Sequence, residues 1–253
     1  MRNERIPRFV GLFFGEFRGL IKLNLLFLLC ALPTVGLFIL GFLGFFSGAA
    51  LALSIIAAYP IGGAVTAYFF SLTRMLRDVP GFIWHDFRRK FLENVKQSAA
   101  PGIMCTAFIY MQVYLWGPFL FGGAGIDPGW LITGIVFLLI FGMVTPYIFL
   151  QIAYVDLRMR QIIMNSVLIA FANAPHSIMG AISGSVIWVA FILFFPDSLV
   201  FAPLLALIGF SLSGLLCIVW VWPSVNKQFK IEETLRNRGL PEEASLRNET
   251  GLN

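Results

Sequence analysis

Charged side chains are scarce in this chain, and their scarcity decides the class of protein. Only 12% of the 253 residues are Asp, Glu, Lys or Arg, whereas 58% are hydrophobic and 27 residues are Phe. A soluble domain usually carries about twice that share of charged residues. The composition therefore excludes an ordinary soluble globular protein and indicates a protein that is built to lie in a membrane.

Cysteine and histidine are also few, which excludes several kinds of site. The three cysteines, Cys30, Cys105 and Cys217, lie far apart within apolar runs, so they form neither a CxxC pair nor a disulfide framework. The two histidines, His85 and His176, lack the spacing of metal ligands. No Walker A loop, G-x-S-x-G or HExxH motif occurs. We therefore expect a protein that is not an enzyme and that has no cofactor or metal.

Long apolar runs occupy most of the chain. A bilayer core about 30 Å thick accommodates roughly 20 apolar residues as a helix. On this basis we predict an all-α, polytopic transmembrane bundle within a single domain, 1–222, with a partly disordered cytoplasmic tail, 223–253. Its spans are expected at about 23–46, 49–70, 98–120, 130–154, 177–195 and 200–221. We also expect Pro33 to bend the first span, and Pro60, Gly62 and Gly63 to distort the second.

Basic residues are confined to one side of this predicted topology. If the odd spans run outward, the opposite side carries only Asp127 and Asp197 as charged residues. All 18 Lys and Arg then fall in four segments on the other side, at 1–22, 71–97, 155–176 and 223–253. By the positive-inside rule, this asymmetry predicts a multi-pass protein with both termini in the cytoplasm.

One of these basic segments, 81–97, is also aromatic and reads GFIWHDFRRKFLENVKQ. On a helix its aromatic residues share one face and most of its cations lie elsewhere. Such a helix at a membrane entry is expected to lie in the interface plane, with its cations facing anionic lipid headgroups. The alternative is a docking element for a cytoplasmic partner, whereas nucleic acid is excluded because the charges are held at a membrane face. The candidate residues are Trp84, Phe87, Arg88, Arg89, Lys90, Phe91, Asn94 and Lys96.

Two further patterns concern how the helices pack. Segments that begin at Phe17, Phe91 and Phe171 resemble one another weakly, which suggests three helical hairpins, each preceded by a cytoplasmic amphipathic segment. Besides 81–97, the second such segment is 156–176. The alternative is that all membrane entries look alike. Small residues at GxxxG-like spacing predict close packing of the fifth and sixth spans, at Gly180, Gly184, Gly209 and Ser213.

The stretch IGGAVTAYFFSLTRMLRD, followed by FIWHDFRRKFLENVKQ, resembles the core signature of the YesL-like family of bacterial membrane proteins. The matching positions are Gly63, Thr66, Ala67, Trp84, Asp86, Phe87, Phe91, Asn94, Lys96 and Gln97, with the entry run from Leu23 through Pro33. The resemblance implies no known catalytic activity. Members are encoded beside carbohydrate-uptake ABC transporters in Gram-positive bacteria. It therefore implies a protein of the bacterial cytoplasmic membrane that is associated with ABC transporter permease or ATPase subunits.

Two functions are consistent with the sequence. The first is a non-enzymatic accessory or assembly subunit near a carbohydrate-uptake ABC transporter, and the second is a small-molecule carrier or channel. The predicted spans contain no ionisable residue at mid-depth, which argues against a proton-coupled carrier but not against a passive pore. Among their polar residues, Gln112 is the most costly to place in lipid, and we expect it to form an interhelical hydrogen bond or to contact a ligand.

Overall fold

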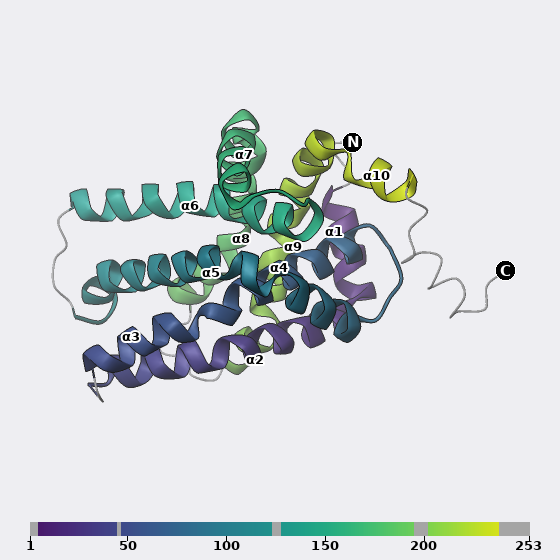
Figure 1. The fold of residues 1–253 in the computed structure, drawn as a ribbon. Helices are drawn as coiled ribbons and strands as arrows, with labels where there is room; N and C mark the ends of the chain where they lie inside the picture. Colours follow the sequence, from purple (N-terminus) through teal and green to yellow (C-terminus); the bar gives the residue numbers. More distant parts are fainter. Residues whose placement is uncertain (1–4, 45–46, 123–127, 195–201, 238–253) are drawn as a thin grey trace.

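A computed structural model describes residues 5–44, 47–122, 128–194 and 202–237, and every regular element in them is an α-helix (Figure 1). This confirms the predicted all-α class. The helices are α1 (Arg5–Gly15), α2 (Phe17–Phe42), α3 (Ser47–Ala57), α4 (Tyr59–Leu76), α5 (Ile83–Gly122), α6 (Pro128–Tyr154), α7 (Met159–Ala172), α8 (Ala174–Phe194), α9 (Ala202–Phe229) and α10 (Ile231–Asn237).

The number of membrane spans depends on two bent pairs of helices. Helices α2, α5, α6 and α9 each contain a stretch long and apolar enough to cross a bilayer. The pairs α3–α4 and α7–α8 meet the same criterion together, with bends of 41° and 98°, which raises the number from four to six. The protein is therefore a multi-pass membrane protein, and the helical bundle of about six spans is confirmed.

Several predicted boundaries change in the structure. The helix of the first predicted span, 23–46, is α2, which contains Pro33 and ends at Phe42. The sixth span extends past residue 221, because α9 continues to Phe229 and includes Pro223. At Lys230 the backbone takes a positive φ of 46°, and α10 then starts as a separate helix, so α9 includes the predicted tail only as far as Phe229. The disorder that we predict further along the tail lies outside the described residues from position 238 onward.

The two glycines of the second span have a different role from the predicted one. The bend between α3 and α4 precedes Pro60, which occupies the first turn of α4, where its missing N–H costs no hydrogen bond. Gly62 and Gly63 lie beyond this bend, inside α4 itself, where α5 packs against them. A Cβ atom on Gly62 would overlap the Ser98 carbonyl oxygen, and one on Gly102 would lie 2.5 Å from the Gly62 Cα. These glycines therefore let two helix backbones touch. The second span is bent as predicted, but the bend lies beside Pro60 and not at the glycines.

Buried hydrogen bonds hold the 98° corner between α7 and α8, where the two helices run in nearly perpendicular directions (Figure 1). The Ser177 hydroxyl donates to the Ala170 carbonyl at 2.9 Å, and its oxygen lies 2.9 Å from the Tyr147 hydroxyl on α6. One turn further along α6, the Gln151 amide donates to Ser166 on α7 at 2.7 Å. Polar side chains of α6 therefore fix the direction of α7, which covers most of the predicted segment 156–176.

Replacing Ser177 with alanine should loosen this corner. The change removes the hydroxyl that links α6, α7 and α8, and it leaves buried polar groups unpaired, which typically costs about 1–3 kcal/mol. We expect a lower unfolding temperature in detergent and faster hydrogen exchange in α7. Thr133→Ala is the matched control, because that hydroxyl is exposed and bonds only within its own helix. Equal effects of the two substitutions would contradict the assignment.

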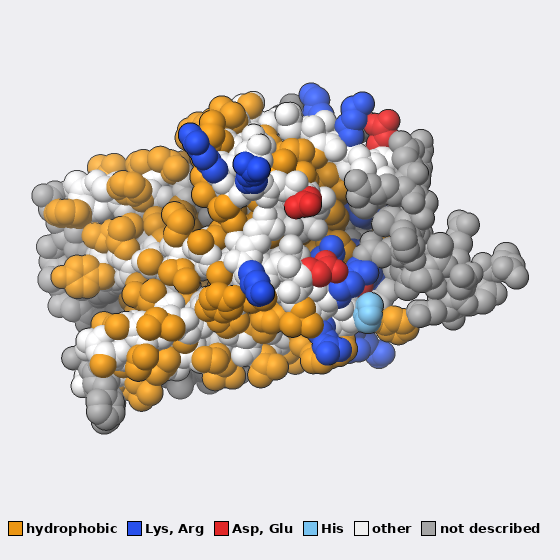
Figure 2. Space-filling model, viewed as in Figure 1, with side chains coloured by type: hydrophobic (Ala, Val, Ile, Leu, Met, Phe, Trp, Pro, Cys, Tyr) orange, Lys and Arg blue, Asp and Glu red, His pale blue; other side chains and the backbone are white. Residues whose placement is uncertain are grey.

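Charged side chains gather at one end of the bundle. On the face drawn in Figure 2, the described Lys and Arg residues lie over the end that carries α1, α7 and α10, and the opposite end is hydrophobic. At that opposite end Tyr114 and Trp130 are 84% and 61% exposed, as expected for aromatic residues at a membrane–water interface. The described part of the chain thus has one basic end and one apolar, aromatic end.

Candidate functional site

The basic, aromatic segment forms the first part of α5. This helix has 40 residues, which at 1.5 Å per residue makes it about 60 Å long, roughly twice the thickness of the bilayer core. Its apolar second half supplies the third span, so its first half extends beyond the hydrocarbon at the basic end. The expectation of a separate helix over 81–97 is therefore corrected, because the same helix continues from Ile83 through the span.

Four side chains of this extension face outward at intervals of four residues. Trp84 and Leu92 are 63% and 59% exposed, and Arg88 and Lys96 are exposed between and beyond them. Residues four apart lie on the same side of a helix, so these side chains form a continuous row, here called the α5 stripe. The α5 stripe alternates an apolar side chain with a cation, which suits both lipid headgroups and a partner protein.

Other candidate residues of the segment lie inside the protein. Phe87 is 4% exposed and Asn94 is 9% exposed, while Phe91 is half-buried against the core. The Asn94 amide donates to the Lys90 carbonyl one turn earlier, at 2.9 Å. A surface role for Phe87 and Asn94 is therefore corrected. Helical periodicity identifies an aromatic face but does not distinguish a face that meets lipid from one that meets α4.

Two of the candidate cations already have partners. The Lys90 ammonium lies 3.0 Å from a Glu93 carboxylate oxygen and 5.0 Å from the centre of the Phe70 ring. The Arg89 guanidinium lies 3.8 Å from the carboxylate of Asp86. Lys90 and Arg89 therefore make contacts within the protein, whereas Arg88 and Lys96 point outward in the α5 stripe.

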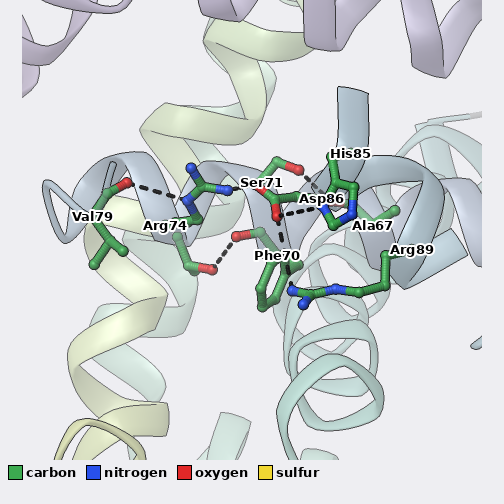
Figure 3. Close-up of polar contacts among 9 residues, drawn as sticks. Ala67, Phe70, Ser71, Arg74, Val79, His85, Asp86 and Arg89 are labelled. Atoms are coloured by element: carbon green, nitrogen blue, oxygen red, sulfur yellow. Dashed lines mark hydrogen bonds and ion pairs between the residues drawn. The ribbon is translucent and has the colours of Figure 1, made fainter. Parts of the chain in front are cut away.

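An ion pair between α4 and α5 lies beneath this surface (Figure 3). Asp86 is 8% exposed, and its carboxylate pairs with the guanidinium of Arg74, whose side chain is 12% exposed. The Arg74 Nε also donates to the Val79 carbonyl at 3.2 Å, so this one side chain fixes the turn between the two helices. A Cβ on Gly81 would overlap the Arg74 guanidinium, so a side chain in this position would displace the arginine from its place in the turn. The positive φ of 54° at Asp78 completes the reversal.

The Arg74–Asp86 pair was not predicted from the sequence. The two residues lie twelve positions apart on different helices, so helical spacing does not connect them. One sequence feature pointed to a special role for Asp86, because it is an acidic residue shortly before three consecutive basic residues. In the folded protein its charge is compensated by Arg74 on the preceding helix, as a buried carboxylate requires.

A cavity of about 230 Å³ adjoins this ion pair. Its walls come from the α1–α2 junction, the end of α4 and the start of α5, and they include Glu16, Ser71, Arg74, Asp78 and Asp86. The cavity therefore brings acidic side chains from three segments around one guanidinium. Among the residues that the structure describes, no group of three His, Cys, Asp or Glu side chains is arranged to hold a metal ion.

The small residues of the last two spans lie at the contact between α8 and α9. A Cβ on Gly180 would lie 2.9 Å from a methyl group of Val221, and one on Gly184 would lie 3.4 Å from the Cβ of Cys217. The Ser213 hydroxyl donates to the Gly184 carbonyl. Gly209 is buried one turn before Ser213 on α9. The residues that Gly180 and Gly184 meet on α9, Cys217 and Val221, were not identified from the sequence.

Buried polar residues also join other spans. Asn24, which the sequence analysis passed over, is fully buried in α2, and its side-chain oxygen accepts the Ser211 N–H of α9 at 3.0 Å. The Ser211 hydroxyl donates in turn to the Leu20 carbonyl at 2.8 Å. Between α5 and α6, the Gln112 amide donates to the Gly134 carbonyl at 3.0 Å, which is the interhelical role expected of it. These contacts make the polar residues of the spans part of the packing.

Comparison with known proteins gives no match of any kind: no family model, no curated protein and no solved structure matches this chain.

Proposed function

We propose that this protein is a non-enzymatic membrane subunit that docks another component of the bacterial cytoplasmic membrane through its basic end. In this proposal the partner is the permease or ATPase of a carbohydrate-uptake ABC transporter. The observation that carries the docking role is the α5 stripe, in which Trp84, Arg88, Leu92 and Lys96 are exposed at the basic end. The choice of partner comes from the resemblance to the YesL-like family.

The geometry supports a rigid docking element. The Arg74–Asp86 pair and the Gly62–Ser98 contact fasten the first half of α5 to α4, so the α5 stripe keeps its orientation in the free protein. Preorganisation lowers the entropy cost of binding. Exposed Trp and Arg residues are also the types that most often dominate the binding energy of protein interfaces. Anionic lipid headgroups would bind those cations of the basic end that the partner does not cover.

The orientation in the membrane can be tested with single cysteines in a variant that lacks Cys30, Cys105 and Cys217. We expect a cysteine in place of Tyr114 to react with a membrane-impermeant maleimide in intact cells. A cysteine in place of Arg88 should react only after the cells are opened. Labelling of position 88 from outside would contradict a cytoplasmic basic end.

The partner can be tested by photo-crosslinking in native membranes. Benzoylphenylalanine at Leu92 places the probe in the α5 stripe, and the same probe at Ile132 of α6 is the control, since the two side chains are 59% and 62% exposed. We expect crosslinks to permease or ATPase subunits from position 92 and none from position 132. Consistent absence of these subunits from the position 92 crosslinks would refute the proposed partner.

A carrier or channel is the second candidate, and one observation favours it. A cavity of about 350 Å³ lies among six helices of the bundle. Solute flux into liposomes that contain the pure protein separates the two functions, because a docking subunit should produce no flux.

A further inference from the structure

The cavity of about 350 Å³ is not used by the docking role. It lies where α2, α4, α5, α6, α8 and α9 meet, and it is lined mainly by aromatic and small side chains. Its volume is at the lower end of the range of about 300–1,000 Å³ that is typical of small-molecule sites. The aromatic walls come from separate helices and include Tyr68, Phe141, Trp188 and Phe210.

The polar groups in these walls are directed at one another. The Tyr68 hydroxyl donates to the Phe210 carbonyl, and the Thr145 hydroxyl donates to the Phe141 carbonyl at 2.7 Å. The Trp188 indole N–H donates to the Ser213 hydroxyl oxygen at 3.3 Å. Because these donors are occupied within the walls, a polar ligand would lose its hydrogen bonds to water on entry. An apolar space whose polar groups are already paired favours apolar ligands.

A groove on the surface that faces lipid adjoins the cavity. This groove of about 420 Å³ runs between α6 and α8, and its walls include Leu138, Ile182 and Val186, which are 44%, 48% and 52% exposed. Both the groove and the cavity are lined by Ala181 and Ser185.

The groove and the cavity meet beside Ser185. At the level of Ala181, α6 and α8 are in close contact, because a Cβ added to Gly142 would lie only 3.3 Å from the Ala181 Cβ, and a chain cannot pass there. One turn further along α8, Ser185 lines both spaces, so a flexible chain that lies in the groove reaches the interior past this small side chain.

We propose that groove and cavity together form a binding site for one acyl chain of a membrane lipid, which enters from the bilayer between α6 and α8. The headgroup stays at the membrane surface while the chain passes beside Ser185 and ends among the aromatic side chains. In a bilayer the chain exchanges one apolar surface for another, so the fit to the aromatic walls decides the affinity. This proposal does not depend on the docking function.

Photo-labelling of the full chain in liposomes tests the site. The probe is a phosphatidylglycerol that carries a diazirine at the middle of one acyl chain, and adducts are mapped by mass spectrometry. We expect adducts on Tyr68 and Cys217, which line the cavity and are only 6% and 8% exposed. Adducts confined to residues that face lipid, such as Ile182 and Val186, would overturn the proposal.

Blocking variants sharpen this result. Ser185→Phe closes the passage and Val65→Phe fills the cavity from the opposite wall, so each should lower the Tyr68 adducts by about tenfold, equivalent to about 1.4 kcal/mol of binding. Met179→Phe is the matched control on α8, because Met179 is 42% exposed and lines neither space. Unchanged labelling in a folded blocking variant would contradict the site.

Competition in the wild-type protein gives a reading that needs no variant. An excess of lauric acid, which is a chain with a small headgroup, should suppress the Tyr68 adducts. Glycerol phosphate, which is a headgroup without a chain, should leave them unchanged. The opposite pattern would mean that the headgroup rather than the chain is recognised, and it would overturn the proposal.

Discussion

Replacing Gly62 with alanine should strongly destabilise the folded protein. The added Cβ would overlap the Ser98 carbonyl oxygen on α5, and both groups belong to helix backbones that cannot move independently. Overpacking in a core costs about 1–3 kcal/mol and sometimes more, and here no flexible side chain is available to move aside. We expect the upper end of this range, seen as a lower unfolding temperature and a smaller monodisperse fraction in detergent.

Gly36→Ala is the matched control for this substitution. Gly36 lies in the interior of α2, and within the described part of the chain a Cβ there would meet no atom of another helix within 4 Å. The helix propensity of alanine should make this change neutral or stabilising by about 0.5–1 kcal/mol. If Gly62→Ala were tolerated as well as Gly36→Ala, the close approach of α4 and α5 could not be correct. Gly102→Ala offers an independent check, because its Cβ would lie 2.5 Å from the Gly62 Cα.

The second large effect is expected at Asp86. Its replacement by alanine leaves the Arg74 guanidinium in a site where the arginine side chain is only 12% exposed. Removing one partner of a buried ion pair typically costs about 3–5 kcal/mol, because the remaining charge stays buried with less compensation. We expect about 3 kcal/mol here, since the pair lies near the end of the bundle. The free energy of unfolding in mixed micelles measures the loss.

A double variant distinguishes the effect of the lost charge from a general disruption of the turn. Replacing Arg74 with Met and Asp86 with Leu removes both charges and keeps the volume, so much of the lost stability should return. Glu93→Ala is the control for an exposed pair, because Glu93 is 48% exposed beside Lys90, and its loss should cost less than about 1 kcal/mol. A double variant that is no more stable than Asp86→Ala would show that the charges are not the reason for the effect.

The α5 segment shows where sequence reasoning stops. Periodicity placed Phe87 and Phe91 on one helix face, and the structure has that face directed at the protein, with Phe87 4% exposed. The cations divide in the same way: Arg88 is exposed, whereas Arg89 lies near Asp86 and Lys90 contacts Glu93 and Phe70. An amphipathic pattern states which residues share a face. It does not state whether lipid, water or another helix covers that face.

Composition and the length of the apolar runs determined that this chain is a helical membrane protein. The bilayer core offers no hydrogen-bond partners, so backbone groups must bond to one another within helices or closed barrels, and the apolar runs have the length of helical spans. The gathering of basic residues into four segments was equally visible in the sequence. Only the tertiary structure decided that Gly62 and Gly102 are contact points, that Arg74 neutralises Asp86, and that six helices leave an aromatic cavity between them. These features depend on residues far apart in the chain. In lipid the hydrophobic effect does not drive helices together, so the pattern of polar and apolar residues does not show which helices pack against each other.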